Sequence, residues 1–208
     1  MQTLHQRPVD LDIIIPVYNL EKFLQPMLES LKAQDYGDYH VEILFVLNNC
    51  TDNSEGVIRD SGLPCRIINC TTQGCGPARN AGLEVTNGQY IWFMDGDDWL
   101  LYNTAVRDAL DVAQGRDIIW TRYESDTFRR QYFSMVWQYV ISRQLIGSTR
   151  FPNYQPSEDD AFMLEILKKV GFDPYTYTLM VSTIRPLYYY NYFREGSNMY
   201  RWHHGEKI

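Results

Sequence analysis

Four short, continuous apolar runs constrain the fold of this chain more than any other feature of its sequence. They cover residues 11–18, 41–48, 65–70 and 89–94. Such runs, rich in Val, Ile and aromatic residues, are typical of strands that other elements cover on both faces. Segments with helical spacing separate them. Strands that alternate with helices predict an α/β fold, with a mostly parallel central sheet flanked by helices and right-handed crossovers.

The helical segments are recognised by apolar residues that recur every three or four positions. In the first of them this spacing extends from Leu20 to Leu31, and Asn19 is the expected N-cap. Pro26 interrupts the pattern and predicts either a kink or a late start of the helix. Three more elements are expected in the same part of the chain: helices over residues 77–85 and 103–114, and a strand over residues 117–123.

The pattern changes from about residue 128, where the regular alternation of strands and helices ends. Helical segments are expected around residues 135–145 and 158–169. Two aromatic, alternating runs at residues 175–182 and 187–193 predict later strands or extended segments.

This division predicts how the chain is organised. Ligands of parallel sheets bind at the carboxyl ends of the strands, and the parallel strands are expected in the first part of the chain. We therefore expect one domain over residues 1–208. Its nucleotide-binding half would cover about residues 1–115, and a smaller lid or acceptor-binding half about residues 116–208.

The composition argues against several classes of protein. The formal net charge of -7 argues against a protein that binds duplex nucleic acid non-specifically, because such binding needs a basic face. The four cysteines form no C-x-x-C pair, which argues against a zinc site and for free thiols in a reducing compartment. The first residues show no signal sequence, and no apolar run could span a bilayer. We expect a cytoplasmic protein without a transmembrane segment.

The fourth apolar run leads directly into three carboxylates, in the sequence YIWFMDGDDWL. Repulsion among Asp95, Asp97 and Asp98 costs stability unless a positive charge lies nearby. A divalent cation shared with substrate phosphates would supply that charge to Asp95 and Asp97. Asp98 is interpreted instead as a cap of the following helix. Phosphatases and nucleotidyltransferases also carry D-x-D pairs, so this motif alone does not identify an activity.

Several motifs in one order resemble a known family. They are IIIPVYNLEKFL, GPARNAGLEVTNGQYIWFMDGDDWL and SEDDAFMLEIL, followed by the tail PLYYYNYFREGSNM. Together they resemble the family-two inverting glycosyltransferases of the GT-A fold, over about residues 11–198. The resemblance implies a GT-A fold and an enzyme that uses a nucleotide-sugar donor.

The resemblance also implies roles for residues of the donor side. Asp95 would contact the ribose or donor sugar, and Asp97 would hold Mn²⁺ or Mg²⁺ on the diphosphate. Pro16 and Tyr18 would line the nucleobase pocket, where the tyrosine ring suits stacking. Arg79 would lie beside the nucleotide, with a helix-surface arginine as the alternative.

On the acceptor side, the resemblance makes Asp159 the general base that removes the proton of the acceptor hydroxyl. Glu158 would position the acceptor, and Trp137 could stack on an acceptor sugar, although a core role is the alternative. Arg194 and Ser197 match the terminal segment that closes over the diphosphate. The alternative for the Glu158–Asp160 cluster is a set of acidic residues that favour the first turn of a helix.

The chain departs from the family pattern after the second apolar run. It reads VLNNCTDNS where the family commonly reads VDDGSTDNS. The carboxylate that commonly accepts a bond from uracil is replaced by Leu47 or Asn48, and an amide can accept from uracil or donate to cytosine. We expect Asn48 to contact the base and a UDP-sugar to be the donor.

These observations lead to the hypothesis of an inverting, metal-dependent glycosyltransferase that acts on an acceptor hydroxyl. The acceptor could be a glycan, a lipid-linked glycan or another hydroxyl compound, while the charge argues against a nucleic-acid acceptor. Two alternatives remain open. One is a non-catalytic protein of the same fold that binds nucleotide-sugars or glycans. The other is a sugar-phosphate nucleotidyltransferase, although the chain lacks the glycine-rich, basic loop near its N-terminus that this class needs.

Overall fold

The computed structural model describes residues 8–125, 135–153, 157–171 and 181–191. Eight strands form one mixed sheet in the order β3-β2-β1-β4-β7-β6-β8-β5. The strands are β1 (Leu11–Val17), β2 (Val41–Asn48), β3 (Arg66–Cys70), β4 (Tyr90–Phe93), β5 (Trp99–Leu100), β6 (Ile118–Glu124), β7 (Tyr139–Ser142) and β8 (Ser182–Tyr189). The α/β class expected from the sequence is confirmed.

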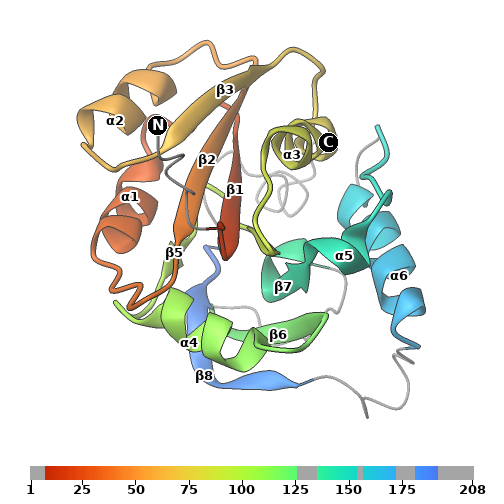
Figure 1. Ribbon diagram of the computed structural model, residues 1–208. Helices are drawn as coiled ribbons and strands as arrows, with labels where there is room; N and C mark the ends of the chain where they lie inside the picture. Colours follow the sequence, from red (N-terminus) through yellow and green to blue (C-terminus); the bar gives the residue numbers. More distant parts are fainter. Residues whose placement is uncertain (1–7, 126–134, 154–156, 172–180, 192–208) are drawn as a thin grey trace, which may run out of the picture.

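Helices cover both faces of this sheet (Figure 1). They are α1 (Leu24–Lys32), α2 (Ser54–Asp60), α3 (Cys75–Val85), α4 (Ala105–Ala113), α5 (Arg143–Ile146) and α6 (Glu158–Lys169), with a 3₁₀ turn η1 (Val136–Gln138). One apolar core lies between the sheet and α1, α2 and α4, and a second lies between the sheet and α3 and α6. No helix in the described part of the chain is long and apolar enough to cross a membrane.

The first four strands in the sheet order are parallel, with β1 between β2 and β4. All seven residues of β1 are buried, as its continuous apolar sequence predicts. Pro16 has no backbone N–H to donate to a neighbouring strand. It fits β1 because the hydrogen bonds with β4 end before it, the last one running from the Met94 N–H to the Ile14 carbonyl oxygen. The carboxyl ends of these strands therefore share one edge of the sheet.

The remaining strands are mixed in direction. β7 runs antiparallel to β4, and β6 runs antiparallel to β7. β8 then runs parallel to β6, and the short β5 pairs with the end of β8. After β4 the chain thus leaves the parallel part of the sheet. The next strand, β5, lies at the edge of the sheet opposite to β3.

Two local predictions are wrong. The segment 135–145 was expected to be helical, but it forms η1, β7 and the start of α5. β7 forms because β4 offers a free edge at which the sequence YVIS can pair, and this pairing overrides the local helical spacing. Asn19 is not an N-cap: it has a left-handed φ of 51°, and α1 begins after Phe23.

Other predictions agree with the structure. Pro26 lies in the first turn of α1, so the late start is confirmed. The helices expected over 77–85 and 103–114 correspond to α3 and α4. Most of the run 175–182 lies outside the described residues, whereas the run 187–193 contains the end of β8. All four cysteines are free thiols.

Candidate active site

The acidic segment DGDD lies between β4 and β5, at the edge where the parallel strands end. Asp95 and Asp97 are half-buried. Asp98 is only 1% exposed and accepts hydrogen bonds from the Tyr188 hydroxyl at 2.7 Å and the Asn191 backbone N–H at 2.8 Å. The expectation that Asp98 caps the following helix is therefore wrong, because its carboxylate points into the protein towards β8.

Arg79 is the centre of the site. Its side chain is 3% exposed, and it extends from α3 towards two separate carboxylate motifs. One terminal nitrogen donates to Asp95 Oδ1 at 2.9 Å. The other donates to Asp159 Oδ1 at 2.5 Å and to Glu158 Oε1 at 3.3 Å. The alternative of a helix-surface arginine is wrong, since this guanidinium is buried among three carboxylates.

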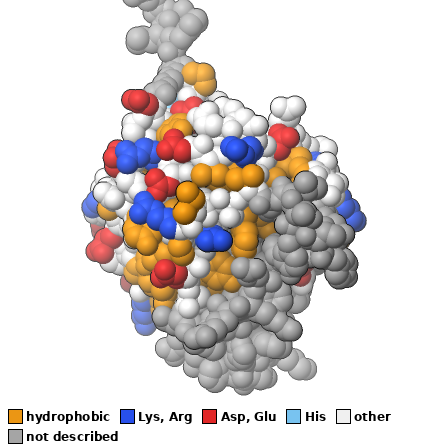
Figure 2. All heavy atoms as spheres, turned by 90° about the horizontal axis from the view of Figure 1, so that it is seen from below, with side chains coloured by type: hydrophobic (Ala, Val, Ile, Leu, Met, Phe, Trp, Pro, Cys, Tyr) orange, Lys and Arg blue, Asp and Glu red, His pale blue; other side chains and the backbone are white. Residues whose placement is uncertain are grey.

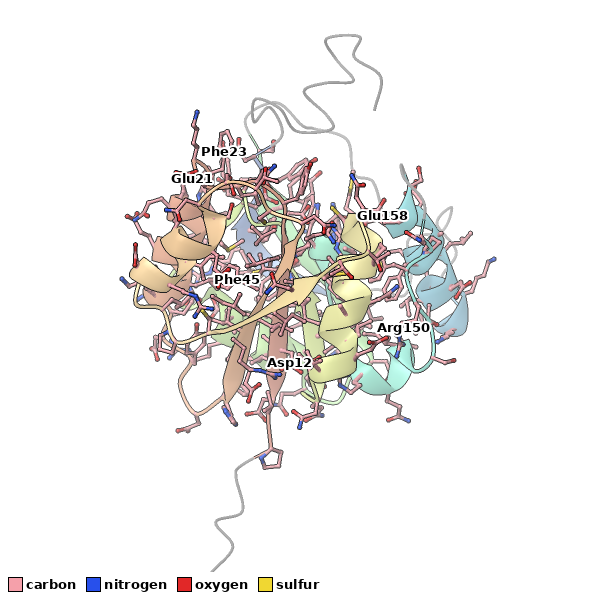
Figure 3. All side chains as sticks on the ribbon, turned by 90° about the horizontal axis from the view of Figure 1, so that it is seen from above. Asp12, Glu21, Phe23, Phe45, Arg150 and Glu158 are labelled. Carbon is pink, nitrogen blue, oxygen red and sulfur yellow. The ribbon has the colours of Figure 1, made fainter. Side chains whose placement is uncertain are left out.

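Close packing between α3 and the N-terminus of α6 makes these contacts possible. A side chain at Gly76 would lie 2.7 Å from the Pro152 carbonyl oxygen, so only glycine allows the first turn of α3 this close. Ser157, directly before α6, has a left-handed φ of 85°. Such strained non-glycine residues are frequent at functional sites. In Figure 3, Glu158 lies near one end of α3, far from Asp12 at the other end of the sheet.

Burial and the neighbouring charges shift the ionisation of the cluster. Burial raises the pKa of Asp159 to about 7, although the Arg79 guanidinium lowers it; Glu158 and Asp95 add to the rise. For Arg79, burial alone would lower the pKa, but Asp159 and Asp95 raise it, so the guanidinium stays charged. Burial also raises the pKa of the nearby Cys75 thiol to about 12. Asp159 is therefore poised to exchange a proton near neutral pH.

The loops that follow β1 and β2 form the rim of this edge. Tyr18 is 52% exposed, while Pro16 is buried within β1. Asn19 Oδ1 accepts a hydrogen bond from the Thr51 N–H at 2.8 Å. Two further bonds of 2.8 and 2.9 Å join the backbone of residues 20–21 to side chains of residues 52–54. The rim is thus fixed in place, with the Tyr18 ring accessible to a ligand.

Asn48 lies at the end of β2 and is 4% exposed. Its side-chain amide donates to the carbonyl oxygens of Cys70 at 3.2 Å and Thr72 at 2.6 Å. Its Oδ1 accepts from the Gly74 N–H at 2.9 Å. The polar atoms of this side chain therefore form hydrogen bonds with the loop that leads into α3. The prediction that Asn48 contacts a base is corrected to a role in holding this loop.

Trp137 has a different position from the one predicted. It is 1% exposed, and its ring stacks on Tyr188 at 4.9 Å and on Tyr190 at 4.7 Å. An acceptor sugar has no access to so buried a ring, so the acceptor role is replaced by the core role. Arg194 and Ser197 lie outside the described residues.

Sequence reasoning also missed two residues of the site. Tyr188 contacts the acidic segment directly, and Cys75 lies beside Arg79. The aromatic run around Tyr188 predicted a strand but gave no sign of which tyrosine reaches a carboxylate. Within the described residues, no group of three His, Cys, Asp or Glu side chains is arranged to hold a metal ion by itself.

Comparison with known proteins agrees with this architecture. The family model described as Glycosyl transferase family 2 matches residues 12–167, from β1 to α6. Among curated proteins, Glycosyltransferase GlyA of Streptococcus pneumoniae serotype 4 is 34% identical over 113 residues. The alignment covers 50% of this chain and 16% of that protein, so the chain spans only a small part of this relative.

Solved structures with a similar fold include two that hold nucleotide-sugars. Staphylococcus aureus TarS 1–349 in complex with UDP-GlcNAc gives a TM-score of 0.75 at 20% identity, over 92% of this chain and 61% of that one. Mannosyltransferase PcManGT from Pyrobaculum calidifontis, in complex with GDP-Man and Mn²⁺, gives 0.72 at 14% identity, over 94% and 60%. Identities this low show the fold alone, and the expected GT-A architecture is confirmed.

Proposed function

The chain belongs to glycosyl transferase family 2, and from this premise we propose that it is an inverting glycosyltransferase. It moves a sugar from a nucleoside diphosphate to an acceptor hydroxyl. The observation that carries this proposal is the bridge made by Arg79 between Asp95 of the D-x-D motif and Asp159 of α6. A buried guanidinium between these two carboxylates holds the donor-side group and the acceptor-side group at a fixed separation, which would help to orient the two reactants.

Asp159 acts as the general base. It takes the proton of the acceptor hydroxyl while the oxygen attacks the anomeric carbon. The bond between that carbon and the diphosphate oxygen breaks on the opposite side, and the nucleoside diphosphate leaves. A pKa of about 7 suits this role, because a base works best when its pKa lies near the working pH. Glu158, 12% exposed beside it, would position the acceptor.

A divalent cation fits the acidic segment if the donor completes its coordination. Asp97 is half-buried at the carboxyl ends of the strands, and Asp95 uses Oδ1 for Arg79. Among the described residues, no three acidic, histidine or cysteine side chains form a metal site by themselves. Mn²⁺ or Mg²⁺ would therefore be held by Asp97 and by the diphosphate, with Asp95 beside them. When bound, the cation would neutralise negative charge on the departing diphosphate.

A UDP-sugar is the first choice of donor. A structural neighbour holds UDP-GlcNAc, but another holds GDP-Man, so the nucleobase needs a direct test. Tyr18, exposed on the rim, would stack on the base, and Pro16, buried near the end of β1, would line the same pocket. Glycans, lipid-linked glycans and other hydroxyl compounds are the candidate acceptors.

Thermal unfolding with nucleotide and metal tests the donor site. Mn²⁺ and UDP together should raise the melting temperature more than the sum of their separate effects, because each completes the other's site. Asp97→Ala should lose this synergy, and Asp60→Ala, which removes an exposed carboxylate from α2, should keep it. GDP, CDP and dTDP in parallel identify the base. Synergy that survives in Asp97→Ala would remove the metal role of this residue.

Transfer is then measured with the donor that stabilises best. Formation of a glycoside with inverted anomeric configuration, read from the anomeric proton coupling by NMR, is the expected result. Donor binding without transfer or hydrolysis would favour the alternative of a non-catalytic binding protein.

A further inference from the structure

We propose that Tyr188 is a positioning residue that holds the acidic segment in its metal-binding shape. The inference rests on the proposed function, in which Asp97 binds a divalent cation. It concerns a residue of β8, which lies outside the part of the chain that matches the family model.

One hydroxyl group joins both ends of the acidic segment. The Tyr188 oxygen accepts a hydrogen bond from the Asp95 backbone N–H at 3.0 Å. The same hydroxyl donates to Asp98 Oδ2 at 2.7 Å. The segment between them, which contains Asp97, is a turn closed by a backbone bond of 3.1 Å from the Asp98 N–H to the Asp95 carbonyl oxygen, and a side chain from another strand holds both ends of this turn.

Asn191, just after β8, adds two more bonds to the same loop. Its backbone N–H donates to Asp98 Oδ1 at 2.8 Å. Its side-chain amide donates to the Asp97 carbonyl oxygen at 3.2 Å. All three aspartates of the segment are thus held from β8 and the residues just after it, and Asp97 is held through its backbone.

Tyr188 is itself fixed on several sides. It is fully buried and pairs with Leu100 where β8 meets β5. Its ring stacks on Trp137 at 4.9 Å and 12° between planes. The Trp137 carbonyl oxygen in turn accepts a bond from the Trp92 indole N–H at 2.9 Å, which ties this stack to β4. The hydroxyl therefore acts from a rigid support, as a group that orients metal ligands must.

Loss of the hydroxyl would leave two polar groups without this partner. Asp98 is 1% exposed, so its carboxylate would have to move or find water, and the Asp95 N–H would lose its acceptor. A shift of Asp98, or of the Asp95 backbone towards a new acceptor, changes the path of the backbone through Asp97. A metal carboxylate displaced by even about 1 Å loses affinity for its cation.

Tyr90 provides a matched control at the other end of β4. It is also buried, at 5% exposed, and its hydroxyl donates to the Ala113 carbonyl oxygen at 2.7 Å. Tyr90→Phe thus removes one buried hydrogen bond of similar length, far from the acidic segment. The comparison of Tyr188→Phe with Tyr90→Phe separates a loss of stability from a loss of metal-site geometry.

The experiment measures the affinity of the full chain for Mn²⁺ at saturating UDP by calorimetry. Wild type and Tyr90→Phe should bind Mn²⁺ equally. Tyr188→Phe should bind it about 10- to 100-fold more weakly, the range typical of groups that orient metal ligands. Should Tyr188→Phe fail to fold, Asn191→Ala, in a partly exposed residue, replaces it and should weaken Mn²⁺ binding in the same direction.

The outcomes are separable. Wild-type protein that binds no Mn²⁺ in the presence of any of the nucleotides overturns the metal site of the proposed function and this inference with it. Wild-type binding with unchanged affinity in Tyr188→Phe, or with an equal loss in Tyr90→Phe, overturns the positioning role alone.

Discussion

Two arginines hold carboxylates at opposite ends of the sheet, and they do so in different ways. Arg143 donates to Asp12 at 3.1 Å, to the Gly88 carbonyl at 2.8 Å and to the Thr86 hydroxyl at 2.9 Å. One carboxylate balances one guanidinium there. Arg79 faces three carboxylates instead of one.

The difference separates a structural site from a reactive one. The Arg143 site ties α3, β1 and the start of α5 together, with one carboxylate against one guanidinium. The Arg79 site carries more negative charge than its guanidinium can compensate, so it has room for a cation and a proton. A fold has no structural need for such a surplus, so it supports the proposal that transfer takes place at the Arg79 site.

The Arg143 site also borders a hollow in the surface. A cavity of about 500 Å³ lies beside Arg143 and is lined by residues such as Gly88, Arg116 and Asp117. The guanidinium of Arg143 is already occupied by bonds within the protein. The hollow therefore offers little unused binding capacity at this guanidinium.

The largest expected effect follows from removing one carboxylate from each site. Asp159→Asn should reduce transfer by about 10²–10⁴, because it deletes the proton acceptor. Its melting temperature should not fall, since the Arg79 site loses surplus negative charge. Asp12→Asn should behave in the opposite way: a free energy of unfolding lower by about 1.5–3 kcal/mol, from a lost charged hydrogen bond, with transfer by the folded protein unchanged.

Both variants are measured by initial rates and by chemical unfolding. An Asp159→Asn enzyme that transfers at the wild-type rate would show that another group is the base. A large loss of activity in folded Asp12→Asn would show that the two sites are not independent.

A smaller effect is expected from pH. With a pKa of about 7, Asp159 loses its function as a base on acidification, so kcat/KM should fall about tenfold per pH unit below 7. The free energy of unfolding should change with pH in the direction opposite to kcat/KM. The folded protein holds a proton on Asp159 between about pH 4 and 7 that the unfolded chain releases, so stability should decrease as pH rises through this window.

Comparison with Asp159→Asn isolates this proton. The difference in unfolding free energy between wild type and the variant, measured from pH 4 to 8, should favour wild type most at low pH. A difference that stays constant across this range would contradict a raised pKa.

The smallest effect concerns Asn48, a third site whose groups are balanced. Asn48→Asp would place a carboxylate against the Cys70 and Thr72 carbonyl oxygens, to which the amide now donates. We expect a loss of about 1–3 kcal/mol in unfolding free energy, from unsatisfied buried acceptors, and no shift towards uridine donors. Asn49→Asp, in an exposed neighbour with one long bond of 3.2 Å, should cost much less.

Melting temperatures and the order of preference among UDP, GDP and CDP test this expectation. A stable Asn48→Asp variant that prefers uridine would restore the interpretation of Asn48 as a base-contacting residue.

The motifs could be read from the sequence because each is local. Asp95, Asp159 and Arg79 stand in short stretches that resemble the family, and strands β1 to β4 follow from continuous apolar runs. The pairing of these residues could not be predicted, since Arg79 and Asp159 are 80 positions apart. Their contact depends on the packing of α3 against α6.

Other features depend on tertiary partners. β7 is a strand because β4 has a free edge with which it can pair. The sequence of the β7 segment does not show that such an edge lies beside it. Asn48 lies in the motif VLNNCTDNS, but its side chain forms hydrogen bonds with the loop before α3. Tyr188 is one of several tyrosines in an alternating run, and the run predicts burial without predicting which hydroxyl reaches Asp98.

The bond between Tyr188 and Asp98 has a consequence for how the protein is made. The two residues are 90 positions apart, and chains are synthesised from the N-terminus. Strands β1 to β4 can pair early, but Asp98 must wait hydrated until β8 leaves the ribosome. The acidic segment is then among the last parts to take its final shape. A nascent chain can therefore pair strands β1 to β4 before its acidic segment takes its final shape.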